Sequence, residues 1–223
     1  SAEVVSSTVP CSTKWMVGTV NSFYIGIIST AIATALGTMA ALGLSRPHMP
    51  YKPLIMSILI SPMIVPLIIT AAGMFFFYAR INLVYTFTGV ILAHVALATP
   101  FVVITVTATL VGFDMNMVKA AQSLGAKPLR TFFKVIMPLI LPGIISGALF
   151  AFITSFDEVV IVMFMASIDQ LTIPKQMWAG IRQEISPVIL CMATCLVILS
   201  IVLLTTVELL RRRSERLRGI KAR

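Results

Sequence analysis

The sequence predicts an all-α, polytopic integral membrane protein, and three observations support this fold class. The chain of 223 residues is 58% hydrophobic, with a mean hydropathy of +1.01. Asp, Glu, Lys and Arg are absent from five long stretches, namely 15–45, 53–79, 81–113, 135–156 and 185–207. Each stretch exceeds the roughly 20 apolar residues that a helix needs to cross the hydrocarbon core. A soluble bundle would need polar outer faces at the helical period, which these stretches lack.

Five spanning helices are therefore expected, each with its backbone hydrogen bonds satisfied internally, at 19–44, 54–78, 87–111, 139–167 and 187–210. In the first helix small residues recur every four positions and predict close packing against a neighbouring span: Ser29, Ala33, Gly37 and Ala41. Pro62, Pro66 and Pro100 predict kinks or breaks in the second and third helices. We also expect a further span, or a cleaved signal, before Ser1.

The basic residues predict the orientation in the membrane. Thirteen of the 17 Lys and Arg residues lie in the loops near 46–52 and 113–136 and in the tail 211–223. The opposite loops carry only Lys14, Arg80, Lys175 and Arg182. Because basic residues are retained on the cytoplasmic side, residues 1–18 are expected outside and the tail inside. The net charge of +9 is explained by this topology, so no nucleic-acid partner is required.

A polar, basic segment at 113–136 separates the third and fourth predicted spans. Residues 117–124 favour a helix, Gly125 suits the positive backbone angle that ends a helix, and Pro128 suits the first turn of another. Pro138 and Pro142 predict the bend into the fourth span. The segment is either a helical hairpin at the cytoplasmic surface or a basic loop with no special role.

The motif in this segment resembles the EAA loop of the permease subunits of ABC importers. The resemblance extends over about 21–210 and is carried by these residues: Ala120, Ala121, Gly125, Ala126, Phe132, Pro138, Pro142 and Gly143. It implies a type I ABC importer permease fold in which the loop inserts into a groove on an ATPase subunit. The implied contact residues are Lys119, Ala120, Ala121, Gln122, Ser123, Leu124, Gly125 and Ala126. Lys119 departs from the family, which usually has Glu at this position.

Further along the chain, the residues resemble the polyamine branch of these permeases. The similar segments are 155–158, 177–178 and 181–185, followed by Pro187. The resemblance implies a multi-pass protein of the bacterial inner membrane that transports spermidine, putrescine or another small cation. The implied partners are a second permease subunit, two ATP-binding subunits and an extracytoplasmic binding protein. An amino-acid derivative, opine or phosphonate remains an alternative substrate.

The energy for transport must come from another chain. No G-x-x-x-x-G-K-[ST] phosphate loop occurs in the sequence, so ATP and Mg²⁺ are expected on partner subunits, and this chain is expected to have no cofactor and no catalytic role. An ion-coupled secondary transporter would show an inverted repeat, which the predicted spans lack. A membrane enzyme would need a cluster of acids, bases or metal ligands, and no catalytic or metal site is predicted.

Two adjacent acids lie in the fourth predicted span. Asp157 and Glu158 follow Thr154 and Ser155, and these four residues are the candidates for the translocation path of a cation. Carboxylates inside a membrane cost about 2.5 kcal/mol or more and normally face a cavity or a partner. Adjacent helical residues point about 100° apart, so the two acids need not share a target. The alternative is a salt bridge to another subunit.

The remaining candidates are weaker. His94 is expected to be a buried, hydrogen-bonded histidine rather than a proton relay. Cys191 and Cys195 lie one helical turn apart, and packing is their expected role. The outer loop 167–187 contains Trp178, Arg182 and Glu184, which could contact a binding protein or simply anchor the loop at the membrane interface.

Overall fold

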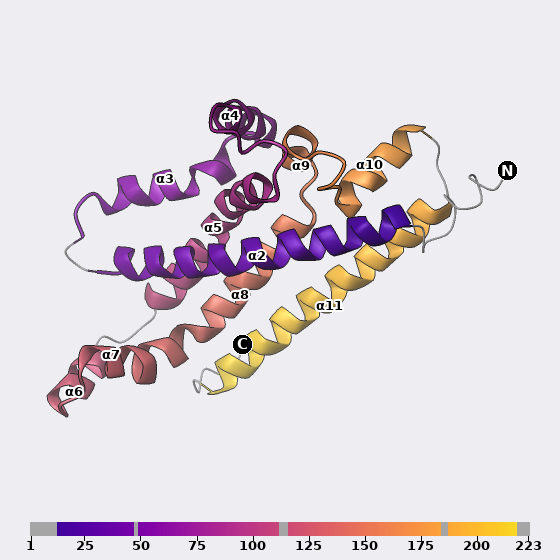
Figure 1. The fold of residues 1–223 in the computed structure, drawn as a ribbon. Coiled ribbons are helices and arrows are strands. Elements are labelled where there is room, and N and C mark those ends of the chain that lie inside the picture. The colour runs from indigo at the N-terminus through magenta and orange to yellow at the C-terminus, as the bar shows by residue number, and fades with distance from the viewer. Residues whose placement is uncertain (1–12, 47–48, 112–115, 184–186, 218–223) are drawn as a thin grey trace.

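The computed structural model describes residues 13–46, 49–111, 116–183 and 187–217, and within these ranges all regular structure is helical. The all-α prediction is therefore confirmed. The elements are α2 Thr13–Leu44, α3 Lys52–Ile64, α4 Leu67–Arg80, α5 Phe87–Val111, α6 Asn116–Ser123, α7 Pro128–Thr131, η1 Phe132–Ile136, α8 Met137–Phe156, α9 Val160–Met165, α10 Ile173–Gln183 and α11 Pro187–Leu217. The core of the bundle is formed by α2, α5 and α8, which pack along one another (Figure 1).

The small residues of α2 bring it close to α5. Ser29 donates its hydroxyl hydrogen to the carbonyl oxygen of Ile91 at 3.3 Å, and Ala33 and Ala41 are completely buried. A Cβ atom placed on Gly37 would stand 2.7 Å from Cβ of Val102. The predicted packing of this stripe against a neighbouring span is confirmed, and the neighbour is α5.

A second set of small residues was not recognised in the sequence. Gly143 and Gly147 of α8 lie directly against Thr109 and Thr105 of α5. Without side chains at these two positions, the two helices approach closely, as is common where helices pack in lipid. The spacing of four residues was the available signal.

The span predicted over 54–78 is broken into two helices, and the break expected at Pro66 is confirmed. The chain bends by 102° between α3 and α4, and the break lies at Val65 and Pro66. Pro66 has no N–H to donate within a helix, so the break follows from its chemistry. Pro62 is accommodated inside α3, and α5 is continuous through Pro100.

The prediction of one helix over 139–167 is wrong. Helix α8 ends at Phe156, and α9 starts only at Val160. Within the described ranges, three helices are long and apolar enough to cross a membrane, and the bent pair would make a fourth. In α11 the described apolar stretch is Ile189–Val202, so the count of five spans stays a prediction.

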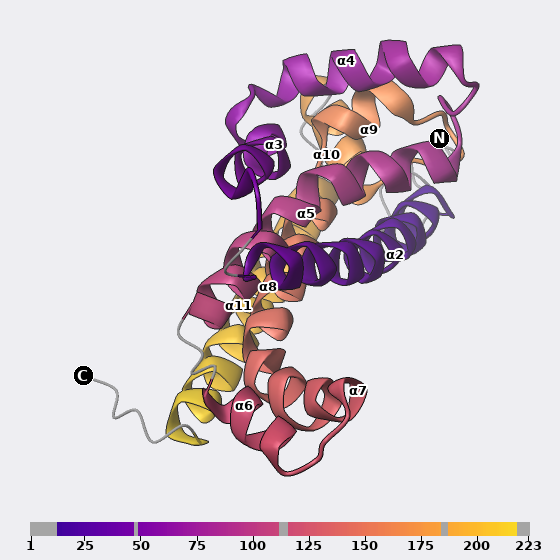
Figure 2. The same ribbon diagram turned by 90° about the vertical axis from the view of Figure 1, so that its left-hand side faces the viewer.

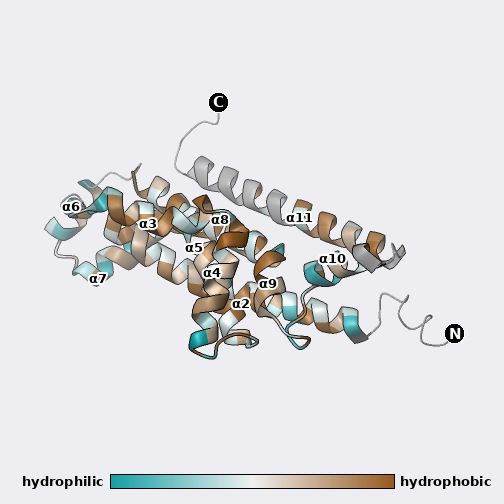
Figure 3. Ribbon diagram, turned by 90° about the horizontal axis from the view of Figure 1, so that it is seen from above, coloured by the Kyte–Doolittle hydropathy of each residue, from teal (hydrophilic) through white to brown (hydrophobic). Residues whose placement is uncertain are grey.

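The elements at the two ends of the elongated bundle differ in character. Figures 1 and 2 place α6 and α7 at one end, together with the last turns of α11, and place α9 and α10 at the other. Figure 3 shows that the hydrophilic residues gather at the ends, especially on α6 and α7, while the long helices between them are mostly hydrophobic. This distribution suits a protein whose middle lies in lipid.

Candidate functional site

The hairpin of α6 and α7 turns at Gly125, which has a φ of 79°. The N–H of Ala126 donates to the carbonyl of Ala121 at 3.1 Å, and the N–H of Gly125 donates to that of Gln122 at 2.9 Å. These two bonds form the Schellman motif, which ends a helix on a left-handed residue. The predicted glycine-centred turn is confirmed.

The hairpin exposes apolar side chains that no described part of the chain covers. Leu124 is 89% exposed and Leu129 is 75% exposed. No residue of α6 is buried, and Lys119 is exposed beside them. Among the other predicted contact residues, Ala121 and Ala126 are half-buried, and Ala120, Gln122 and Ser123 are exposed. An exposed apolar surface with a basic rim is typical of a docking surface for another protein.

The second arm of the hairpin is not a separate helix. Helix α7 continues through the π-helical turn η1 directly into α8, so that the helix from Pro128 to Phe156 runs for 29 residues. A bend was predicted at Pro138 and Pro142; the helix stays unbroken through both prolines, and the π-helical turn η1 lies directly before them. The hairpin is thus joined to the far end of α8 by continuous helix.

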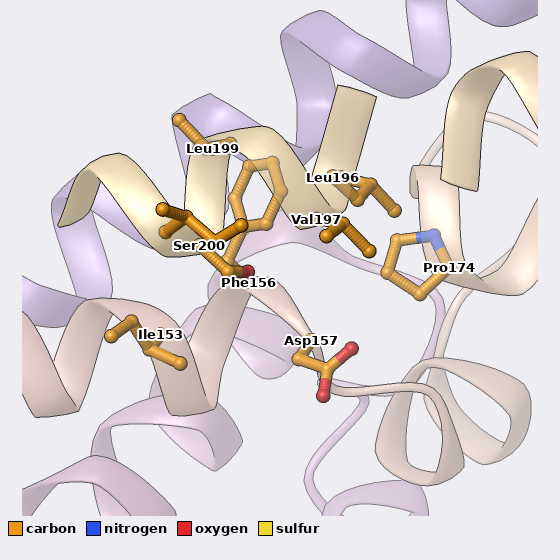
Figure 4. A pocket seen from close by; sticks show the side chains of 9 residues that line it. Ile153, Phe156, Asp157, Pro174, Leu196, Val197, Leu199 and Ser200 are labelled. Carbon is orange, nitrogen blue, oxygen red and sulfur yellow. The ribbon is translucent and has the colours of Figure 1, made fainter. Parts of the chain in front are cut away.

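Asp157 occupies the break at that far end. Its N–H still donates to the carbonyl of Ile153 at 3.0 Å, and its side chain is exposed to a cavity of about 280 Å³. Figure 4 shows the carboxylate at the edge of this cavity, among apolar side chains of α8, α10 and α11. The cavity is lined by Ile153, Phe156, Asp157, Pro174, Leu196, Val197, Leu199, Ser200 and Ile201.

Glu158 points elsewhere. Its Oε1 atom accepts a hydrogen bond from the N–H of Ile161 at 2.9 Å, and its side chain is only 7% exposed. The two adjacent acids therefore have different surroundings, as predicted, and the reason is that both lie in the break between α8 and α9 and not on one helix. Of the two, Asp157 is the one that an arriving ligand can reach.

Ser155 and Thr154, the other candidates on this helix, do not line the cavity. Ser155 is buried, and its Oγ lies 2.8 Å from Nδ1 of His94 on α5. Thr154 is half-buried. His94 is buried and hydrogen-bonded through Nδ1 as predicted, whereas its Nε2 has no hydrogen-bond partner within the described part of the chain.

The segment before α10 is held on the first part of α2. Nδ2 of Asn21 donates to the carbonyls of Asp169 and Leu171, at 2.7 and 3.0 Å. The hydroxyl of Ser22 accepts a hydrogen bond from the N–H of Ile173 at 2.9 Å. Asn21 and Ser22 were not recognised in the sequence, although two polar residues near the amino-terminal end of an apolar span were a signal.

The predicted outer-loop contacts are placed only in part. Trp178 is 46% exposed on α10. Arg182 lies in the last turn of α10, and Glu184 lies outside the described residues. Lys175 was not predicted to have a role, yet its Nζ donates to the carbonyls of Val162 and Ala166 at 3.2 and 3.0 Å. Its partial burial lowers the pKa of this ammonium group.

An apolar helical bundle of this kind, with an exposed hairpin that turns at Gly125, has the architecture of an integral membrane protein. The chain belongs to the family of binding-protein-dependent transport system inner membrane components, whose model matches residues 16–216. It is thus a multi-pass inner-membrane permease with the fold of type I ABC importer permeases.

The relatives agree with this assignment. The spermidine/putrescine transport system permease protein PotC of Haemophilus influenzae is 29% identical over 88% of this chain and 76% of its own length. The putrescine transport system permease protein PotI of Escherichia coli K12 is 38% identical over 46% of this chain and 37% of its own. Among solved structures, the inward-facing MetNI methionine ABC transporter matches 88% of this chain and 94% of its own, with a TM-score of 0.70 at 18% identity.

Proposed function

We propose that this chain forms the translocation path of an ATP-driven importer for a small organic cation, most specifically a polyamine. One observation carries the proposal: a continuous helix of 29 residues joins the hairpin to the residue next to Asp157. At 1.5 Å per residue this helix is about 43 Å long, which is enough to cross a membrane. A movement of the hairpin can therefore be transmitted directly to the carboxylate.

The hairpin is the proposed contact with the ATPase. Two partner ATPase subunits bind ATP and Mg²⁺, and their closure moves the segment Lys119–Ala126 as a rigid body. Because α7, η1 and α8 are continuous, the movement tilts α8 against α2 and α5 and exchanges inward-open and outward-open states. The exposed side chains of Leu124 and Leu129 would become buried in the ATPase groove.

The chemistry of the cavity favours an amine as the substrate. Asp157 supplies one carboxylate, and none of the nine lining residues is cationic. An ammonium group can pair with this carboxylate while its alkyl chain lies on the apolar wall. An opine or a phosphonate carries an anionic group, for which this lining offers no cationic partner. The names of the spermidine and putrescine relatives point to the same class.

The remaining partners and the orientation belong to the same proposal. The hairpin faces the cytoplasm, and α9 and α10 face outward, where an extracytoplasmic binding protein delivers the substrate near Trp178. A second permease subunit completes the path across the bundle. The support is the basic charge at the hairpin end of the molecule and the permease family of the chain.

The coupling step is tested by Gly125→Asp in the complete transporter, reconstituted in liposomes with its partner subunits. A Cβ at this position meets nothing within 4 Å in this chain, so the new charge acts mainly on the docked partner. We expect ATP hydrolysis stimulated by the loaded binding protein to fall roughly tenfold or more, which corresponds to the loss of at least about 1.4 kcal/mol of coupling.

The matched control is Gly125→Asn, because asparagine tolerates the left-handed conformation and adds no charge. It should keep most of the stimulated hydrolysis. Normal stimulation in Gly125→Asp would contradict the docking role of the hairpin. Uptake that continues with an inactive ATPase would show instead an ion-coupled secondary transporter.

A further inference from the structure

Helix α9 is too short to be stable by itself. It has six residues, and isolated helices of this length do not persist, because the nucleation cost exceeds the few hydrogen bonds gained. Its first N–H groups and last carbonyls also have no partner within the helix. Inside a membrane protein, unpaired backbone groups of this kind are costly, so something outside the helix must satisfy them.

Two charged side chains satisfy some of these groups, one at each end of α9, and the carbonyl of Val162 also accepts from the N–H of Ala166 at 3.1 Å. Oε1 of Glu158 accepts from the N–H of Ile161 at 2.9 Å. At the other end, Nζ of Lys175 donates to the carbonyls of Val162 and Ala166 at 3.2 and 3.0 Å. The carbonyl of Met165 accepts in addition from the N–H of Tyr85 at 2.9 Å.

The capped helix is also fixed to the bundle. Ile161, Val162 and Met165 are completely buried, and α9 packs against α4 and α5. Asp157 therefore lies in a short break between two anchored helices, α8 and α9. In addition, Pro174, the residue before Lys175, forms part of the same cavity wall as Asp157 (Figure 4). Glu158 thus directly follows the carboxylate-bearing residue, and Lys175 directly follows a residue of the cavity wall.

We propose that Glu158 and Lys175 are positioning residues that hold the Asp157 carboxylate at the cavity by capping α9, and that neither touches the transported cation. This inference rests on the proposed function, in which Asp157 receives the cation. It separates the roles of two adjacent acids: Asp157 is a ligand, and Glu158 is a structural acceptor. Glu158 suits this role because it is 7% exposed and already bonded.

The test compares conservative and disruptive variants at both caps. The complete transporter is reconstituted in liposomes with saturating binding protein, and two rates are measured: uptake of radiolabelled spermidine and ATP hydrolysis. Their ratio gives the substrate moved per ATP. A loss of correctly assembled transporter lowers both rates together and leaves the ratio unchanged, whereas a misplaced carboxylate lowers the ratio.

Glu158→Gln keeps an acceptor oxygen for the N–H of Ile161 and should keep the ratio within about twofold of the unmodified transporter. Glu158→Ala removes the acceptor and should lower the ratio roughly tenfold. Lys175→Met, which keeps the length but not the donors, should lower it similarly. Lys175→Arg, which can still donate to both carbonyls, should restore most of it.

The proposed roles of Glu158 and Lys175 would each be overturned by a different result. If Glu158→Gln loses uptake as fully as Asp157→Asn, Glu158 contacts the cation. If Lys175→Met keeps a normal ratio, the cap on the last turn of α9 has no positioning role. Because Glu158→Gln preserves the hydrogen bond, this comparison holds even if Glu158→Ala fails to assemble.

Asp157→Asn tests the proposed function separately. It should lower the ratio by roughly tenfold or more, since it removes a charge-assisted contact to the cation. Normal transport by Asp157→Asn would remove Asp157 from the path and overturn the proposed function. A normal ratio in both Glu158→Ala and Lys175→Met, with transport lost in Asp157→Asn, would overturn only the inference on the caps.

Discussion

At the scale of single residues, neighbours in sequence have different roles here because the helix ends between them. Ser155 is still inside α8 and pairs with His94, whereas Asp157 is at the end of α8 and reaches the cavity. Glu158 turns toward the start of α9. These three polar residues look alike in the sequence but have different roles: Ser155 makes a contact in the core, Asp157 reaches the cavity, and Glu158 caps a helix.

The buried pair of His94 and Ser155 gives a prediction of stability. Ser155→Ala leaves Nδ1 of His94 without its partner, and Nε2 has none already among the described residues. An unsatisfied buried polar group costs about 1–3 kcal/mol, so the unfolding temperature in detergent should fall. Ser57→Ala is the control, because Ser57 is exposed and its hydroxyl bonds to a carbonyl of its own helix.

The double variant His94→Leu with Ser155→Ala sharpens this prediction. Replacing both members of a buried polar pair by apolar groups can be nearly neutral, so it should recover part of the stability lost in Ser155→Ala. If Ser155→Ala unfolds at the same temperature as Ser57→Ala, the hydrogen bond contributes nothing to stability.

Lys119 supports a second prediction at this scale. It is exposed on α6 and stands where the family usually has a carboxylate. If it meets an acidic group of the ATPase, Lys119→Glu should weaken the association of the two subunits, measured by co-purification, by roughly fivefold or more. A reversal of charge on the ATPase should restore it, and Lys52→Glu, also exposed but outside the hairpin, should have little effect. Failure of every reversal to restore binding would show that Lys119 has no charged partner there.

At the scale of elements, close helix packing depends on where glycine is placed. Gly37 of α2 faces α5, whereas a Cβ atom placed on Gly43 of the same helix would meet no described atom within 4 Å. In lipid, such close approaches supply much of the attraction between helices, since no hydrophobic effect operates between them. Adding side-chain volume at Gly37 should therefore disturb the contact between α2 and α5, whereas adding it at Gly43 should not.

Gly37→Leu should accordingly destabilise the bundle. Its Cβ would overlap Cβ of Val102 at 2.7 Å, and overpacking of this kind costs about 1–3 kcal/mol. Gly43→Leu is the matched control on the same helix and should leave the unfolding temperature in detergent nearly unchanged. Equal effects of the two substitutions would mean that the packing of α2 on α5 does not limit stability.

At the scale of the whole molecule, the hairpin of α6 and α7 lies at one end of the bundle (Figures 1 and 2), and Asp157, which lines the cavity, directly follows the opposite end of the helix that starts in this hairpin. If ATP hydrolysis on a partner subunit is to move a cation, the hairpin must be rigidly connected to the cavity. The helix from Pro128 to Phe156 provides this connection. The bent pair of α3 and α4 and the break before α9 are the places where the bundle departs from straight rods.

The orientation of this bundle can be measured. In a variant in which Cys11, Cys191 and Cys195 are replaced, a membrane-impermeant maleimide should label Ile168→Cys in intact cells that lack the binding protein. Ile168 is 83% exposed in the outer segment. Lys52→Cys should be labelled only in inverted vesicles, because its end of α3 is predicted to face the cytoplasm. The reverse pattern would contradict the orientation proposed from the basic residues.

The sequence predicted the helices correctly where local amino-acid composition alone determines them. The apolar stretches, the turn at Gly125 and the small-residue stripe of α2 were all recognised, because each follows from local chemistry. The break after Phe156 was not, since the uncharged residues 159–168 beyond Asp157 and Glu158 suit a continuation of the same span. At this break Glu158 caps the start of α9, and Lys175, which is distant in sequence, bonds to carbonyls at its end.

The amino-acid sequence by itself determined that the chain is helical, crosses a membrane and carries a basic hairpin, because these properties depend on hydropathy, charge and local backbone preference. Only the tertiary structure decided that α7 runs unbroken into α8, that Asp157 faces a cavity, and that Glu158 faces a helix end. The reason is physical: the environment of a side chain is set by residues far away in the chain. Lys175 and Asn21 hold elements they do not adjoin in sequence.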